Sequence, residues 1–289
     1  MTLPARLVLA RMRAASSRHA AWQIASRGVA VRAAGRRRRL ASWLLLVTRV
    51  YAPGERAFYG LTMRHWRAVL REVAAFVSET RSADLVARMS VDDLDAFLAR
   101  KRAQWHAQLQ DLARPAYART ANSALSALEA QIPGGFEVMT TKDPELLRFL
   151  AEKTVRLRQV DDTLIERVRD TMLEGLGENE TVSQLRRRLE LEEGFSVARA
   201  RNTARTETAS AANGARWIGM QQEEVDGREW ATAGDDAVRP SHEAMDGVVI
   251  PVGGQYTLPG GVTLLFPGDP LGPAAEICQC RCAEGPVYD

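Results

Sequence analysis

Lysine and cysteine are scarce in this chain of 289 residues. Only three of its 39 basic residues are lysines, so arginine carries nearly all of the positive charge. A guanidinium group is suited to bidentate pairing with phosphates and carboxylates. The three cysteines, Cys278, Cys280 and Cys282, fall within five residues. They are too close together for a framework of mutual disulfides, which favours a reducing compartment.

Long apolar runs are also missing. The longest candidate, Trp43 to Val47, lies between Arg39 and Arg49 and is far shorter than the roughly 18 to 20 residues that a bilayer requires. Arginine interrupts the first 40 residues every few positions, which is unlike the apolar core of a secretory signal. We therefore expect a protein that is not secreted and has no membrane partner.

The familiar motifs of catalysis are absent too. The sequence has no phosphate-binding glycine loop, no nucleophile elbow and no dinucleotide-binding fingerprint, so we expect no enzymatic activity and no catalytic residues. One enzymatic alternative stays open. Asp235, Asp236, His242 and Glu243 could surround a hard cation, as in a metal-dependent nuclease.

The positive charge is concentrated near the N-terminus. The formal net charge is only +3, yet residues 1–81 hold 16 arginines against three acidic residues. Residues 1–55 are interpreted as an arginine-rich arm exposed to solvent. The alternative is contact with nucleic-acid phosphates, with the block Arg36, Arg37, Arg38 and Arg39 as the candidate contacts. The chain would then be a DNA-binding accessory protein that acts through residues 1–81.

Two consecutive helical regions are predicted after the arm, over residues 56–136 and 137–226. In the first, Thr62 is expected to cap a helix, Ser90 and Asp93 form a capping box, and Pro115 is expected to interrupt the helix. The second shows four helix starts, at Asp143-Pro144, near Asp162, at the capping box of Thr181 and Gln184, and at Ser196.

The pattern changes at Gly227. From there to residue 289, glycine and proline separate short apolar runs over residues 248–250, 256–258 and 262–266. We refer to residues 227–289 as the C-terminal module. The chain is thus predicted to be α+β, with a mostly helical N-terminal and central region followed by a small β-containing module. A module of this size is marginally stable by itself and needs support from a helix or a metal.

His242, Cys280 and Cys282 have the chemistry of a structural zinc site. Thiolate and imidazole groups suit a closed tetrahedral site, and a histidine lies about 40 residues before the clustered cysteines. The spacing differs from the common pair of two-residue knuckles. The cysteines could instead be small apolar residues of an inner strand, or serve a redox function.

Several motifs together resemble the phage head-morphogenesis family of Mu F-like minor head proteins. The resemblance covers about residues 137–289. It rests on these segments: Asp143 to Leu147, Thr181 to Leu189, Ala204 to Thr208, Trp230 to Asp235, Val238 to His242, Met245 to Gly247, Phe266 to Pro270, and Ala274 to Cys282.

The resemblance implies a non-enzymatic minor head protein of a tailed phage or prophage, found in the virion head and in the cytoplasm of the bacterial host. Its implied partners are the portal protein and capsid or scaffold proteins, with a role in DNA packaging or delivery. The motif residues that would hold the C-terminal module together are Glu207, Trp230, Asp235, Arg239, Ser241, His242, Asp246 and Gly247. Asp235 and Arg239 are expected to pair with each other or with backbone groups.

Two positions depart from the family pattern. Gln279 stands where the family usually has asparagine, and Cys278 stands where an aliphatic residue is expected. Cys278 is therefore a weaker candidate ligand than Cys280 or Cys282.

Overall fold

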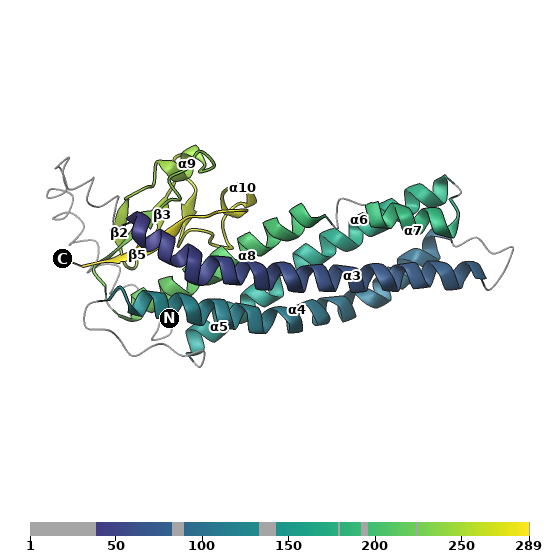
Figure 1. Cartoon of the computed structure of the whole chain (residues 1–289), viewed down its shortest axis with the longest axis horizontal. Helices are drawn as coiled ribbons and strands as arrows, with labels where there is room; N and C mark the ends of the chain where they lie inside the picture. The colour runs from purple at the N-terminus through teal and green to yellow at the C-terminus, as the bar shows by residue number, and fades with distance from the viewer. Residues whose placement is uncertain are drawn as a thin grey trace, which may run out of the picture. The chain divides into compact units, whose positions relative to one another are not determined.

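The computed structural model describes residues 39–82, 90–132, 143–178, 180–191, 196–223 and 225–288 (Figure 1). Long helices dominate up to residue 223, and short antiparallel strands follow, so the α+β prediction is confirmed. The helical elements are a stretch at 39–46, a π-helix at Val47–Tyr51, α3 (Ala52–Ser82), α4 (Val91–Glu129), α5 (Pro144–Arg156), α6 (Arg158–Gly177), α7 (Val182–Leu191), α8 (Val197–Gln222), α9 (Pro240–Glu243) and α10 (Ala274–Ile277). None of the described helices is long and apolar enough to cross a bilayer.

The predicted helix starts at Ser90, Asp143 and Thr181 are confirmed by their capping bonds, whereas the helix expected from about Asp162 begins at Arg158 without a side-chain cap. The backbone amide of Asp93 donates to Ser90 Oγ at 3.1 Å, and the amide of Ser90 donates back to Asp93 Oδ2 at 3.0 Å. Thr181 and Gln184 form the same reciprocal pair at 3.3 and 2.8 Å. Asp143 Oδ1 accepts two backbone amides at the start of α5, both at 2.9 Å. These bonds satisfy amides that a helix leaves unpaired at its N-terminus.

Two predicted helix boundaries were wrong. Thr62 lies inside α3, which begins at Ala52, and its side chain is buried. Pro115 lies inside α4, which continues to Glu129. Pro115 is on the exposed face, but Ala113, Ala116 and Tyr117 near it are fully buried, so packing outweighs the single hydrogen bond that proline removes.

The chain divides into two compact units. One consists of Met1–Glu55, Tyr117–Leu150 and Arg205–Asp289, and the other consists of Arg56–Ala116 and Ala151–Ala204. Each unit is assembled from separate stretches, whereas the sequence predicted four consecutive segments. The difference arises because α3, α4, α5 and α8 each contribute residues to both units.

The unit of residues 56–116 and 151–204 is a helical bundle. Its largest core cluster consists of Val69, Val73, Val77, Leu94, Phe97, Leu98, Trp105, Ile165, Val168, Met172, Leu185 and Leu189. Phe76 stacks on Phe97 with ring centroids 4.1 Å apart. A buried pair joins His65 Nε2 and Asp161 Oδ1 at 2.8 Å.

The other unit contains the C-terminal module. Strands β1 (Gly227–Ala231), β2 (Val249–Pro251) and β5 (Ala283–Val287) form an antiparallel sheet in the order β2-β1-β5. A second antiparallel pair joins β3 (Tyr256–Thr257) and β4 (Thr263–Leu264). Strands β2, β3 and β4 lie where the sequence predicted short apolar runs, whereas β1 and β5 fall outside those runs. The module's core gathers around Trp230, whose ring meets Tyr256 at 4.9 Å between centroids.

Part of the predicted arm belongs to this folded unit. Residues 39–55 are helical, and Leu46, Val50 and Tyr51 are buried. The Tyr51 hydroxyl donates to Asn213 Oδ1 in α8 at 3.0 Å. A solvated arm therefore does not extend to residue 55, because apolar residues from 46 onward pack into a core. Residues 1–38 lie outside the described residues.

Candidate metal centre

His242 comes from the short helix α9, which the sequence encodes locally. Arg239 is extended at the N-cap, and Pro240 occupies the first helical turn, where its missing amide costs nothing. The helix turns the imidazole of His242 inward, so that only 1% of the residue is exposed. Its ring meets the Trp230 ring edge-on at a centroid distance of 5.4 Å.

The cysteines come from the segment between α10 and β5. Cys280 and Cys282 are buried, at 1% and 2% exposure, whereas Cys278 is exposed. Gln279 separates them with a φ of 57°, the only positive φ at a non-glycine residue of the described chain. This left-handed residue breaks the two-residue alternation of an extended segment, so Cys278 does not share the inner face with the other two.

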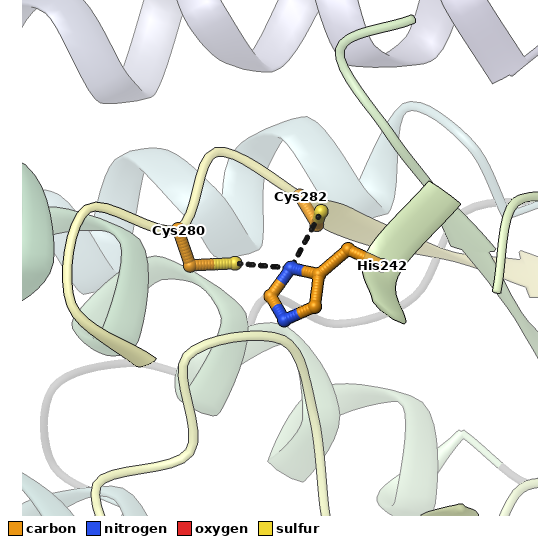
Figure 2. A group of neighbouring side chains, drawn as sticks. All are labelled: His242, Cys280 and Cys282. Atoms are coloured by element: carbon orange, nitrogen blue, oxygen red, sulfur yellow. Dashed lines mark hydrogen bonds between the residues drawn. The ribbon is translucent and has the colours of Figure 1, made fainter. Parts of the chain in front are cut away.

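The three predicted ligands meet in the core of the C-terminal module (Figure 2). Nδ1 of His242 lies 3.7 Å from Cys280 Sγ and 3.5 Å from Cys282 Sγ. One ligand atom from each of the three residues lies within 4.8 Å of the others. For ordinary zinc bond lengths, a tetrahedral site places sulfur and nitrogen ligands roughly 3.5 Å apart. The donor types and their spacing therefore fit a zinc ion, with one coordination position left over.

The two thiols differ in their electrostatics. The hydrogen bond from Cys282 lowers the pKa of Cys280 to about 5, against the effect of burial, and the His242 imidazole lowers it further. The pKa of Cys282 is raised well above its usual value, first by that same hydrogen bond and then by burial. The pKa values of the two thiols thus shift in opposite directions. A zinc ion would hold both as thiolates.

Glu276 lies on the outer side of His242. Its Oε2 is 3.0 Å from His242 Nε2, without the alignment of a full hydrogen bond, and it accepts a 2.9 Å hydrogen bond from Ser241 Oγ. A carboxylate beside the nitrogen that faces away from a metal fixes the ring's tautomer and orientation in zinc sites. Ser241, which the motif predicted as structural, thus acts through Glu276.

The motif residues Asp246 and Gly247 form a second junction. Asp246 Oδ1 accepts the backbone amide of Thr232 at 2.9 Å and its hydroxyl at 3.0 Å. Arg39 pairs with Asp246 at 3.3 Å and with Glu229 at 2.8 Å. Gly247 has a φ of 78°, a backbone conformation that favours glycine. A Cβ atom at this position would also lie 3.0 Å from the Arg39 guanidinium, which would have to shift.

Asp235 and Arg239 were expected to pair with each other or with backbone groups, and the first alternative is wrong. Asp235 instead forms a bidentate pair with Arg281, with 2.6 Å between Oδ2 and the first guanidinium nitrogen, and the Arg281 guanidinium holds the pKa of Asp235 below its usual value. Arg239 donates to the backbone carbonyl of Cys278, which agrees with the alternative expectation of a backbone partner. Both arginine contacts fasten the cysteine segment to the turn that precedes α9.

Of two further motif residues, Glu207 lies on α8, and Trp230 packs against His242 in the core that holds the metal group. Glu207 in α8 accepts a 2.6 Å hydrogen bond from the buried Tyr117 hydroxyl. Trp230 is fully buried in β1. The predicted nucleic-acid contacts Arg36, Arg37 and Arg38 lie outside the described residues. The nucleic-acid contact predicted for Arg39 stays untested, but its guanidinium already pairs with Glu229 and Asp246 of the C-terminal module.

The acidic set of the nuclease alternative is not assembled. Asp235 is paired with Arg281, Asp236 and Glu243 are exposed, and His242 faces the cysteines. Within the described ranges, His242, Cys280 and Cys282 are the group with metal-binding potential.

Sequence reasoning missed the polar residues that join the cysteine strand to its surroundings. Asn213 donates to the carbonyls of Pro267 and Cys282 at 2.8 and 3.0 Å. Arg216 donates to the carbonyl of Glu284 at 2.8 and 3.1 Å. Both lie in α8, one helical turn apart on the same face. No local signal marks them, apart from their being large polar residues between small ones.

Comparison with known proteins places this site within a described family region. Residues 162–284 match the family model described as Phage Mu protein F like protein. The chain is 32% identical over 130 residues to Minor head protein GP7 of Bacillus phage SPP1, which covers 42% of this chain and 40% of that protein. It is 25% identical over 169 residues to the uncharacterized protein YqbB of Bacillus subtilis strain 168, covering 57% of this chain and 54% of that protein.

These alignments leave much of both relatives unmatched, since the chain spans about half the length of the curated relatives it matches. No solved structure matches the chain significantly.

Proposed function

We propose that this chain, whose residues 162–284 are a Phage Mu protein F like region as the motifs predicted, is a minor head protein that acts in head morphogenesis of a tailed phage. The observation that carries the proposal is the match of this region both to the family and to a minor head protein of another phage. The matched region includes α6 to α8 and the whole metal group.

The geometry is consistent with a structural rather than an enzymatic role. In the described part of the chain, the polar motif residues are engaged with other side chains or with backbone groups. They fasten the cysteine segment, the sheet and α8 together. An active site would instead need polar groups held ready for a substrate.

The test is genetic and structural. The gene is deleted from the phage or prophage that encodes it, and head particles are counted by electron microscopy, with the gene restored in trans as the control. We expect fewer or aberrant heads after deletion, and the chain itself in purified heads by mass spectrometry. Normal heads without the chain would contradict the proposal.

Portal association and a role in DNA packaging or delivery are finer parts of the proposal. The family resemblance supports them, and we propose on the same ground that the protein is found in the virion head after assembly in the host cytoplasm. Co-purification of tagged chain with the portal protein from infected cells tests the first part. The amount of DNA per head tests the second.

We further propose that zinc is the cofactor of the C-terminal module, with His242, Cys280 and Cys282 as protein ligands. Three buried donors of the correct chemistry and spacing support this. Zinc would link α9 to the cysteine segment and supply cohesion that a module of about 60 residues lacks. A water molecule or an outside ligand would fill the fourth position.

The chain supplies its own control for zinc binding. Elemental analysis of the purified full chain should give about one zinc for the unaltered protein and for Cys278→Ser, because Cys278 is exposed and outside the group. Cys280→Ser and Cys282→Ser should lose the metal. Zinc absent from the unaltered chain, or lost equally from Cys278→Ser, would contradict the proposed ligands.

A further inference from the structure

One face of α3 carries a stripe of arginines. Arg56, Arg64, Arg67 and Arg71 are all exposed. At 100° per residue they fall within an arc of about 80°, and at 1.5 Å per residue they span roughly 22 Å of the helix. All four belong to the helical unit of residues 56–116 and 151–204. We call these four residues the α3 arginine stripe.

The stripe is not neutralised within the described chain. No hydrogen bond or ion pair joins its four guanidinium groups to another described residue. Other arginines of the same unit behave differently: Arg169 pairs with Asp95 at 2.6 Å, and Arg188 pairs with Glu180 at 2.7 Å. The stripe differs from these paired arginines and gathers four exposed guanidinium groups, unpaired among the described residues, along one face of a single helix.

The acidic residues of α3 do not compensate the stripe either. Glu72 points to another face of the helix and pairs with Lys101 at 2.8 Å. Glu55 lies 3.6 Å from Arg205. Glu79 is the third acidic residue of α3. By helix geometry all three lie about 100° or more from the centre of the stripe. The stripe therefore presents about four positive charges in a row with no carboxylate among them.

We propose that the α3 arginine stripe binds the phosphate backbone of duplex DNA. A straight row of guanidinium groups complements a duplex, which presents a charge every 1.7 Å or so along its axis and gains affinity by releasing counterions. Single-stranded nucleic acid fits less well. The nearby aromatic residues Phe58, Tyr59 and Trp66 pack inward, so no platform for base stacking flanks the stripe.

This surface is separate from the arginine block at residues 36–39 and from the metal group. It does not depend on the proposed head role, since it rests on the charge and geometry of one helix. Binding would be independent of sequence, because contacts to phosphates carry no base information.

The experiment measures binding of the full chain to a fluorescent 30-base-pair DNA by anisotropy at several salt concentrations. The test variant combines Arg64→Gln, Arg67→Gln and Arg71→Gln. The matched control combines Arg186→Gln, Arg187→Gln and Arg201→Gln, which removes the same charge from exposed arginines of the same unit. Glutamine keeps helix propensity, and a thermal melt of both variants checks the fold.

We expect the slope of log affinity against log salt to become shallower by about 2.7 in the stripe variant, at roughly 0.9 per lost phosphate contact. The control should retain most of its slope. Equal losses in the two variants would reduce the effect to overall charge and overturn the proposal, as would an unchanged stripe variant. Tighter stripe-dependent binding to poly-glutamate or to duplex RNA would assign the stripe to an acidic protein or to RNA instead.

Discussion

Arg228 donates a 2.6 Å hydrogen bond to Glu284, and neither side chain has any exposed surface. The same guanidinium donates to the carbonyls of Val252, Gly254 and Leu265 at 2.7 to 2.9 Å. The two residues lie on neighbouring strands, β1 and β5. This buried ion pair therefore links β1 to β5, and its guanidinium also satisfies three loop carbonyls.

Removal of the arginine should destabilise the protein strongly. In Arg228→Met, Glu284 and three carbonyls lose their buried partner, so we expect the free energy of unfolding to fall by about 3 to 5 kcal/mol. The double variant with Glu284→Leu should lose less than the single one, because no carboxylate is left unpaired. Urea denaturation compares them. A single variant that is more stable than the double one would show that the pair's charges are not coupled in this way.

Glu276 should determine how tightly the proposed zinc is held. Glu276→Gln removes the carboxylate beside His242 Nε2 while keeping the shape of the side chain. Loss of a carboxylate that orients a metal-binding histidine reduces metal affinity by about 10- to 100-fold. Competition with a chromophoric chelator measures the affinity. Glu243→Gln, an exposed neighbour of His242, is the control and should bind as the unaltered chain does. Equal affinities in all three proteins would remove Glu276 from the site.

Gln279→Asn should stabilise the protein. Gln279 is exposed and has a φ of 57°, a conformation that asparagine tolerates better than glutamine. We expect the free energy of unfolding to rise by up to about 1 kcal/mol, measured by urea denaturation. Gln279→Ala serves as the control, because it removes the side chain without relieving the backbone. If the alanine and asparagine variants are equally stable, the backbone strain is not the cause.

The Asp235 pair should make a contribution that disappears in acid. The Arg281 guanidinium lowers the pKa of Asp235 from its ordinary value of 3.8, so the folded state holds the carboxylate more strongly than the unfolded state does. The stabilisation is fully present above about pH 4 and is lost as the pH falls through the lowered pKa of the folded state. Because Asp235 is 48% exposed, the pair should contribute less than about 1 kcal/mol.

Comparison of Asp235→Asn with the unaltered protein by urea denaturation at pH 7 and pH 2.5 tests this sign. The variant should be less stable at pH 7, and the difference should shrink at pH 2.5 and in high salt. Asp236→Asn, at the neighbouring exposed position, should be neutral at both pH values. A difference that grows in acid would contradict the direction of the pKa shift.

The sequence by itself determined the local features of this protein. The capping boxes at Ser90 and Thr181 and the proline start of α5 were predictable because each depends on hydrogen bonds that span two or three residues. Strands β2, β3 and β4 of the C-terminal module were predictable from the glycine and proline that separate its apolar runs. The choice of His242, Cys280 and Cys282 followed from residue chemistry alone.

Only the tertiary structure decided which distant residues meet. Asp235 pairs with Arg281 rather than Arg239, and Arg39 joins Asp246, across separations of 46 and 207 residues. Such partners depend on how the sheet and its loops pack, and no local pattern encodes that arrangement. Likewise, the exclusion of Cys278 from the metal group follows from the backbone at Gln279, where one left-handed residue reverses which side chains face the core.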